Sequence, residues 1–107
     1  MSGTNMTRWT DTELTIHFDG LDLTTIDATP APVVAIKNGI AYTESKTVSV
    51  VDSEKLTARF DQRETAALGA GDAVLQINYW VDGDRKSTDE VPITIGNNIV
   101  NRPIYSN

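Results

Sequence analysis

The stretch Ala73–Val81 constrains the fold more than any other part of this 107-residue chain. Apolar side chains recur there at every second position, and Asp82-Gly83 follows at once. A period of two places successive side chains on opposite faces of a β-strand, and Asp-Gly favours a tight type I′ hairpin turn. We therefore predict a strand with two different faces. Its core face carries Ala73, Leu75, Ile77, Tyr79 and Val81, and its outer face carries Val74, Gln76, Asn78 and Trp80.

The same period recurs in shorter stretches along the whole chain, and Asn38-Gly39 between two of them predicts a second type I′ turn. About seven short strands separated by turn signals predict an all-β fold, an antiparallel β-sandwich whose strand order the spacing does not give. Besides Ala73–Val81, the predicted strands are Leu14–Phe18, Val33–Lys37, Ile40–Glu44, Thr47–Val51, Leu56–Phe60 and Arg85–Ile95.

One segment departs from the strand pattern. Asp61-Gln62-Arg63-Glu64 has the spacing of a capping box, and the glycines at 69 and 71 would stop the helix that it starts. We predict a single short helix over residues 61–68. The rest of the chain is consistent with one domain, residues 1–107, in which 1–11 and 97–107 are terminal tails.

Charge and composition exclude several classes of partner. Nine Lys and Arg against fifteen Asp and Glu leave a formal charge of −6, which opposes binding to nucleic acid. There is no cysteine, so disulfides and thiolate metal sites are excluded. The first residues lack the apolar core of a signal peptide, and the longest apolar run, Ala31–Ile36, contains Pro32 and is too short to span a bilayer. We expect neither a nucleic-acid nor a membrane partner.

Three motifs bear on catalytic, metal or phosphate chemistry. His17 is the single histidine, and no motif supplies it with a nucleophile or an orienting carboxylate, so we interpret it as a solvent-facing strand residue. Asp82-Gly83-Asp84 resembles part of a calcium loop but lacks its spacing and closing Glu, so a hairpin turn explains it more simply. Gly69-Ala70-Gly71 precedes a strand, whereas phosphate loops follow one. We expect no catalytic residue, metal or cofactor, and therefore no enzyme; a small hydrolase ranks last.

Aromatic residues offer the remaining binding chemistry. Trp9, Tyr42, Tyr79 and Trp80 could form a stacking platform for carbohydrate or nucleic acid, although aromatic side chains of β-sandwiches belong more often to the core or its rim. Strand alternation places Trp80 on the outer face beside two amides, a setting that suits a protein interface. The candidate interface consists of Trp80, Asp82, Gly83 and Asp84.

The second half of the chain, Phe60 to Ile99, resembles small phage and prophage proteins from the tail and baseplate gene regions of Gram-positive hosts. The matching elements are the helix "DQRETAAL" closed by "GAG", the strand "AVLQINYWVDGDRKSTD" and the closing stretch "VPITIGNNIV". The opening "LTIHFDGLDLTTID" is similar to the first strand and loop of these proteins. In upper-baseplate proteins this pattern belongs to an N-terminal immunoglobulin-like sandwich.

The resemblance implies a non-enzymatic structural or adaptor protein of a phage tail or baseplate. Its partners would be other tail or baseplate proteins, with a homo-oligomer or multi-copy assembly as the natural state. It would be located in the virion, and in the host cytoplasm before assembly. The alternative is a β-sandwich module that binds carbohydrate on Trp80 or Tyr42, or a peptide along an open edge strand.

Overall fold

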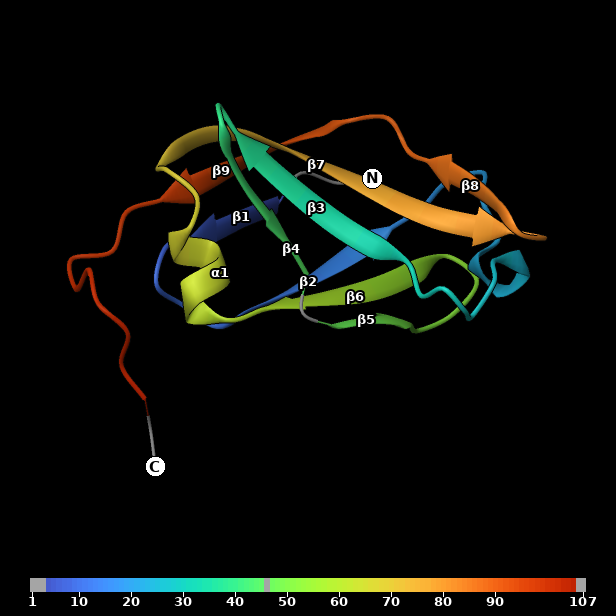
Figure 1. Cartoon of the computed structure of the whole chain (residues 1–107), viewed down its shortest axis with the longest axis horizontal. Helices are drawn as coiled ribbons and strands as arrows, with labels where there is room; N and C mark the ends of the chain where they lie inside the picture. Colours follow the sequence, from blue (N-terminus) through green and yellow to red (C-terminus); the bar gives the residue numbers. More distant parts are fainter. Residues whose placement is uncertain (1–3, 46, 106–107) are drawn as a thin grey trace.

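The computed structural model describes residues 4–45 and 47–105, which form mostly β-structure arranged in two sheets (Figure 1). The smaller sheet has the order β2-β6-β5 and the larger has the order β1-β9-β7-β3-β4, with β8 also paired to β7. The smaller sheet contains β2 (Thr12–His17), β5 (Thr47–Val50) and β6 (Lys55–Phe60). The larger contains β1 (Thr4–Thr7), β3 (Val33–Asn38), β4 (Ala41–Glu44), β7 (Gly71–Val81), β8 (Asp84–Ser87) and β9 (Val91–Gly96).

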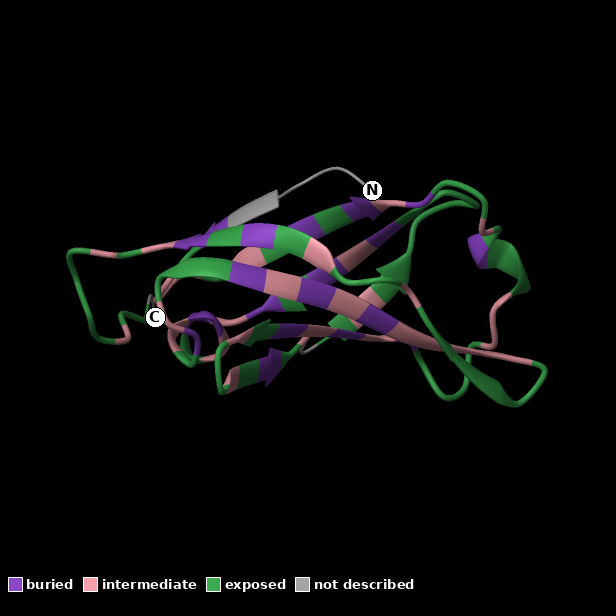
Figure 2. Cartoon of the chain, turned by 90° about the horizontal axis from the view of Figure 1, so that it is seen from above, coloured by how far each residue is buried: buried purple, intermediate pink, exposed green. Residues whose placement is uncertain are grey.

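One hydrophobic core joins the two sheets. Buried and more exposed residues alternate along the strands, so each sheet turns one apolar face inward (Figure 2). β6 contributes Leu56, Ala58 and Phe60, which are fully buried, and β3 contributes Val34 and Ile36. The mainly β-sheet fold predicted from the alternation is therefore confirmed.

The two predicted faces of β7 are present. Ala73, Leu75 and Ile77 are at most 5% exposed, and Tyr79 packs partly buried against the core. Val81, at the end of this face, is only half-buried. On the opposite face the amides of Gln76 and Asn78 are half-buried and hydrogen-bonded. Asn78 Oδ1 accepts from Arg85 Nε and Nη2 at 3.2 Å each, and Gln76 Nε2 donates to Thr88 O at 2.9 Å.

The predicted return strand Arg85–Ile95 is interrupted. Asn78 pairs with Ser87 in β8 and Leu75 pairs with Val91 in β9, so the two β7 residues 76 and 77 oppose the three residues 88–90. One extra residue on one strand is a β-bulge. The bulge lies on the partner of β7, which is why the alternation along β7 is undisturbed. With this split and the addition of β1, the described residues form nine strands rather than about seven.

β1 corrects two further predictions. Thr4–Thr7 runs parallel to β9, so the larger sheet is mixed rather than wholly antiparallel. The predicted N-terminal tail 1–11 thus contains a sheet strand and ends directly before β2, whereas residues 1–3 lie outside the described residues. A parallel partner about 90 positions away leaves no signal in the local sequence. The segment 97–105 contains no strand and instead continues past α1 (Figure 1).

Both predicted hairpins form, one of them with a different turn. Val81 pairs with Asp84, and the two residues between them, Asp82 (φ 50°) and Gly83 (φ 84°), have the positive φ values of a type I′ turn. In the other hairpin Asn38 pairs with Ala41, so the turn residues are Gly39 and Ile40 rather than Asn38 and Gly39. Asn38 is instead a strand residue whose Nδ2 donates to Gly69 O and Asp72 O.

The predicted helix is α1, Gln62–Ala66. Asp61 Oδ1 accepts from the backbone N–H groups of Arg63 and Glu64, and Glu64 Oε1 accepts from Asp61 N at 2.8 Å. These contacts complete the capping box that the sequence predicted. A 3-10 turn, η1 (Leu23–Thr25), precedes β3. No described helix has the length and apolar character needed to cross a membrane.

Candidate functional site

The β7–β8 hairpin tip carries three of the four residues of the candidate interface. Asp82, Gly83 and Asp84 are exposed, and the fourth, Trp80, is half-buried on the outer face of the same strand. The guanidinium carbon of Arg85 lies 5.9 Å from the centre of the Trp80 ring, within cation–π range. Part of one face of the indole is therefore covered by Arg85. The assignment of these four residues to an interface stays a prediction.

Asp27 holds the hairpin tip through contacts that the sequence did not predict. Its Oδ1 accepts from Asp82 N at 3.1 Å, and its Oδ2 accepts from Gly83 N at 2.9 Å. Its own N–H donates to Trp80 O at 2.7 Å. The loop before β3 is thereby joined to the tip. Because 55 residues separate Asp27 from Asp82, no local motif could have indicated this contact.

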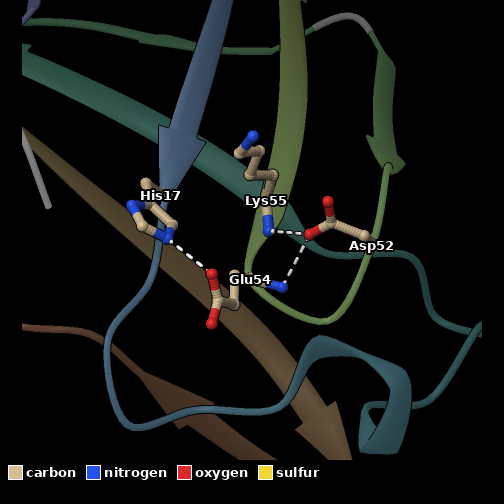
Figure 3. Close-up of polar contacts among 4 residues, drawn as sticks. All are labelled: His17, Asp52, Glu54 and Lys55. Atoms are coloured by element: carbon tan, nitrogen blue, oxygen red, sulfur yellow. Dashed lines mark hydrogen bonds and ion pairs between the residues drawn. The ribbon is translucent and has the colours of Figure 1, made fainter.

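His17 lies at the end of β2, where it forms a pair with Glu54 in the turn before β6 (Figure 3). His17 Nε2 lies 3.0 Å from Glu54 Oε2, and the two side chains are 45% and 64% exposed. In the same turn, Asp52 Oδ1 accepts from the backbone N–H groups of Glu54 and Lys55 at 2.8 and 2.9 Å. Asp52 thus shapes the turn, and the predicted solvent-facing strand histidine has a carboxylate partner supplied by the fold.

The other aromatic candidates lie in separate places. Tyr42, on the edge strand β4, is 54% exposed; desolvation and the neighbouring Glu44 carboxylate raise the pKa of Tyr42 to about 12. Trp9 lies in the β1–β2 turn with φ 64°, and its buried indole N–H has no hydrogen-bond partner among the described residues. Tyr79 belongs to the inner face. The four residues therefore do not form one stacking platform.

Two apolar features were not predicted from the sequence. The first is a groove of about 330 Å³ between η1, the following loop and β5. Its apolar lining is formed by Leu23, Ile26, Ala31, Pro32, Val48 and Val50, with Ala28 and Asp27 completing it. The second is the segment of residues 97–105, in which Ile99 is fully exposed and Ile104 and Tyr105 are more than half exposed.

No group of three or more His, Asp or Glu residues that could hold a metal ion occurs within 4–45 and 47–105. Comparison of the chain with protein-family models, with curated proteins and with solved structures finds no match in any of the three.

Proposed function

We propose that this protein is a non-enzymatic structural or adaptor protein of a bacteriophage tail or baseplate that works through protein–protein assembly. The phage setting, and with it a location in the virion after assembly in the host cytoplasm, rests on the resemblance of Phe60–Ile99 to tail-region proteins. The proposal of assembly rests on the surface of the molecule.

The body of this adaptor would be an immunoglobulin-like sandwich. In such domains strands B, E and D share one sheet, and strands C, F and G share the other, with C′ beside C in the variable type. The order β2-β6-β5 corresponds to B-E-D, and β4-β3-β7 corresponds to C′-C-F. β8 and β9, interrupted by the bulge, together occupy the position of G. With no cysteine, this sandwich would do without the disulfide between strands B and F.

The observation that carries the assembly proposal is the grouping of exposed apolar side chains. Eight large hydrophobic residues are exposed in the described part of the chain, and they fall in three short segments rather than singly over the surface. Grouped apolar side chains mark interaction sites, because exposing them to water together is unfavourable. The segments carry Ile40 and Tyr42, Val50 and Val51, and Ile99, Val100, Ile104 and Tyr105.

Two observations test the proposal together: the genes that neighbour this one, and the binding of their products to this chain. The reading frames beside this gene should encode tail, fibre, holin or lysin proteins, and their purified products should be mixed with this chain in sedimentation-velocity runs. A heavier complex with at least one tail-gene product is expected. A gene neighbourhood without phage frames, together with no complex, would overturn the proposal.

A second candidate function is favoured by β4. Within 4–45 and 47–105 no strand pairs with its outer edge, and β4 carries Tyr42, with the fully exposed Ile40 directly before the strand. An extended peptide could add to this edge as a further strand, with Tyr42 contacting its side chains. A peptide panel and a glycan array, read by tryptophan fluorescence, test this candidate. Binding that Tyr42→Ala abolishes would favour it over the assembly proposal.

A further inference from the structure

Residues 97–103 form a loop, named here the tail loop, that is attached to the body at both ends. β9 ends at Gly96, and at the other end Ile104 is held by Gln62, a buried residue of α1. Gln62 Nε2 donates to Ile104 O at 2.8 Å, and Ile104 N donates to Gln62 Oε1 at 2.7 Å. Arg63 Nε donates to Tyr105 Oη at 2.9 Å. The loop therefore projects from the body with both ends fixed.

The apex of the tail loop is apolar. Asn98 Oδ1 accepts from Val100 N at 3.0 Å, which turns the chain locally. Ile99 is 101% exposed and Val100 is 37% exposed. A pair of aliphatic side chains on a loop fixed in advance loses less conformational entropy on docking than a free segment would lose.

The groove between η1 and β5 has the complementary chemistry. Its walls are mostly aliphatic, with Asp27 also in the lining, and a volume of about 330 Å³ suits small apolar groups rather than a large ligand. Val50, at its rim on β5, is 42% exposed. β5 is also an edge strand of the smaller sheet, so a neighbouring molecule can approach it.

The two features lie toward opposite ends of a molecule that is 43 Å long (Figure 1). The tail loop lies beside α1, whereas the groove lies beside η1 and the loop that leads to β3. While Gln62 holds Ile104, the tail loop of a molecule cannot reach the groove of the same molecule. A second copy can present its tail loop there.

Charge supports the same pairing. The tail loop carries Arg102 and no acidic residue. Residues 23–32 form one wall of the groove and carry Asp27 and no Lys or Arg, and Asp19 and Asp22 precede this wall in the chain. Opposite charges at the rim of a contact favour encounter and fix orientation.

We propose that Ile99 and Val100 of one copy dock in the groove of a second copy, so that the protein assembles head to tail. The inference rests on the proposed assembly function and names its partner, another molecule of this chain. The contact is heterologous, because each molecule contributes a different surface to each neighbour. Such contacts produce a closed ring if the rotation closes and an open filament if it does not.

A mixing experiment with the full chain tests the proposal. Ile99→Glu leaves the groove intact, and Val50→Glu leaves the tail loop intact. Each variant alone should lose self-association by at least about tenfold in sedimentation velocity, as expected for a charge placed in an apolar contact. Mixed together, the two variants can form one intact contact and should give a dimer that grows no further.

Matched controls separate docking from general surface effects. Thr15→Glu on β2 and Thr94→Glu on β9 introduce the same charge at exposed residues outside the two surfaces and outside the three exposed apolar segments, and these variants should assemble like the wild type. Ala31→Glu, at an exposed groove residue, serves as a second groove variant if Val50→Glu alters folding by circular dichroism. Arg102→Ala, or about 1 M salt, where the Debye length is about 3 Å, should weaken assembly less than Ile99→Glu does.

The outcomes separate this inference from the proposed function. A wild-type chain that stays monomeric at high concentration, yet binds a tail-gene product, would overturn head-to-tail assembly and leave the function standing. Self-association that Ile99→Glu and the groove variants leave unchanged would also overturn the inference, as would a mixture that forms no dimer. A chain that assembles as predicted but has no phage gene neighbours would support the contact and contradict the phage setting.

Discussion

At the end of the molecule that contains α1, side chains hydrogen-bond the backbone of segments far away in the chain, whereas the turns η1 and β5–β6 at the end that contains the hairpin tip are held by side chains that bond near neighbours. Thr65 Oγ1 accepts from Thr10 N at 3.1 Å and donates to Thr10 O at 2.9 Å, and Arg8 donates to Leu68 O and Ala66 O. At the tip end, Asp22 and Asp52 bind backbone N–H groups two or three residues away.

This difference has a physical consequence. A hydrogen bond within a turn closes a small loop and can also form in the unfolded chain. Removing it therefore changes the free energy of unfolding little. A buried side chain that bonds the backbone of a distant segment leaves unsatisfied groups when it is removed. We therefore expect the α1 end to be sensitive to single substitutions and the tip end to be tolerant, with Asp27 as an intermediate case.

The largest effect is expected in the middle of β7, the strand that connects the two ends. Ile77→Ala should lower the free energy of unfolding by about 2–5 kcal/mol, because Ile77 is 1% exposed and its removal leaves a cavity. Trp80→Ala, on the outer face, should cost less. Urea midpoints of the two variants measure this. The opposite ranking would mean that Trp80 rather than Ile77 belongs to the core.

At the α1 end, Thr65→Val should lower the free energy of unfolding by about 1–3 kcal/mol. The substitution keeps the shape of this fully buried side chain but removes the oxygen that bonds both backbone groups of Thr10. Thr94→Val, at an exposed residue of β9, is the matched control. Equal urea midpoints for the two variants would show that the α1 end does not depend on this long-range contact.

At the tip end, Asp27→Ala should cost about 1 kcal/mol or less, because the N–H groups that it leaves at Asp82 and Gly83 lie in an exposed turn and can bond water. Hydrogen exchange of these two amides should become faster. Asp84→Ala, at an exposed residue of the same hairpin, is the control. A loss as large as that of Thr65→Val would contradict the contrast between the two ends.

The smallest effect concerns Asp22, where hydrogen bonds from the Thr24 hydroxyl and backbone lower the pKa of the carboxyl below its ordinary value of 3.8. Because the pKa is lower in the folded state, the ionised carboxyl stabilises the fold at pH values above the pKa of the unfolded chain. That stabilisation is lost as the pH falls through the pKa of the folded state. Thr24→Val should therefore raise the pKa of Asp22 and slightly reduce stability at neutral pH, but not at a pH well below the folded pKa of this carboxyl. An NMR titration that finds Asp22 unmoved would contradict this.

The sequence predicts what depends on neighbouring residues. The alternation from Ala73 to Tyr79, the type I′ turn at Asp82-Gly83 and the capping box at Asp61 all follow from short-range geometry, and all three are present. The candidate interface at the tip is visible in the sequence for the same reason, because Trp80 and the turn are part of one local pattern.

Only the tertiary structure decides the features that join distant segments. Three contacts each link positions more than 40 residues apart: the pairing of β1 with β9, the hydrogen bonds of Asp27 to the hairpin tip, and those of Gln62 to Ile104. No residue type or spacing predicts such a pair, because a backbone N–H or C=O group exists at almost every position and any of them can form the contact. The groove and the tail loop arise in the same way. The sequence contains their apolar residues, but the packing of the sheets and loops decides which of these residues share a surface.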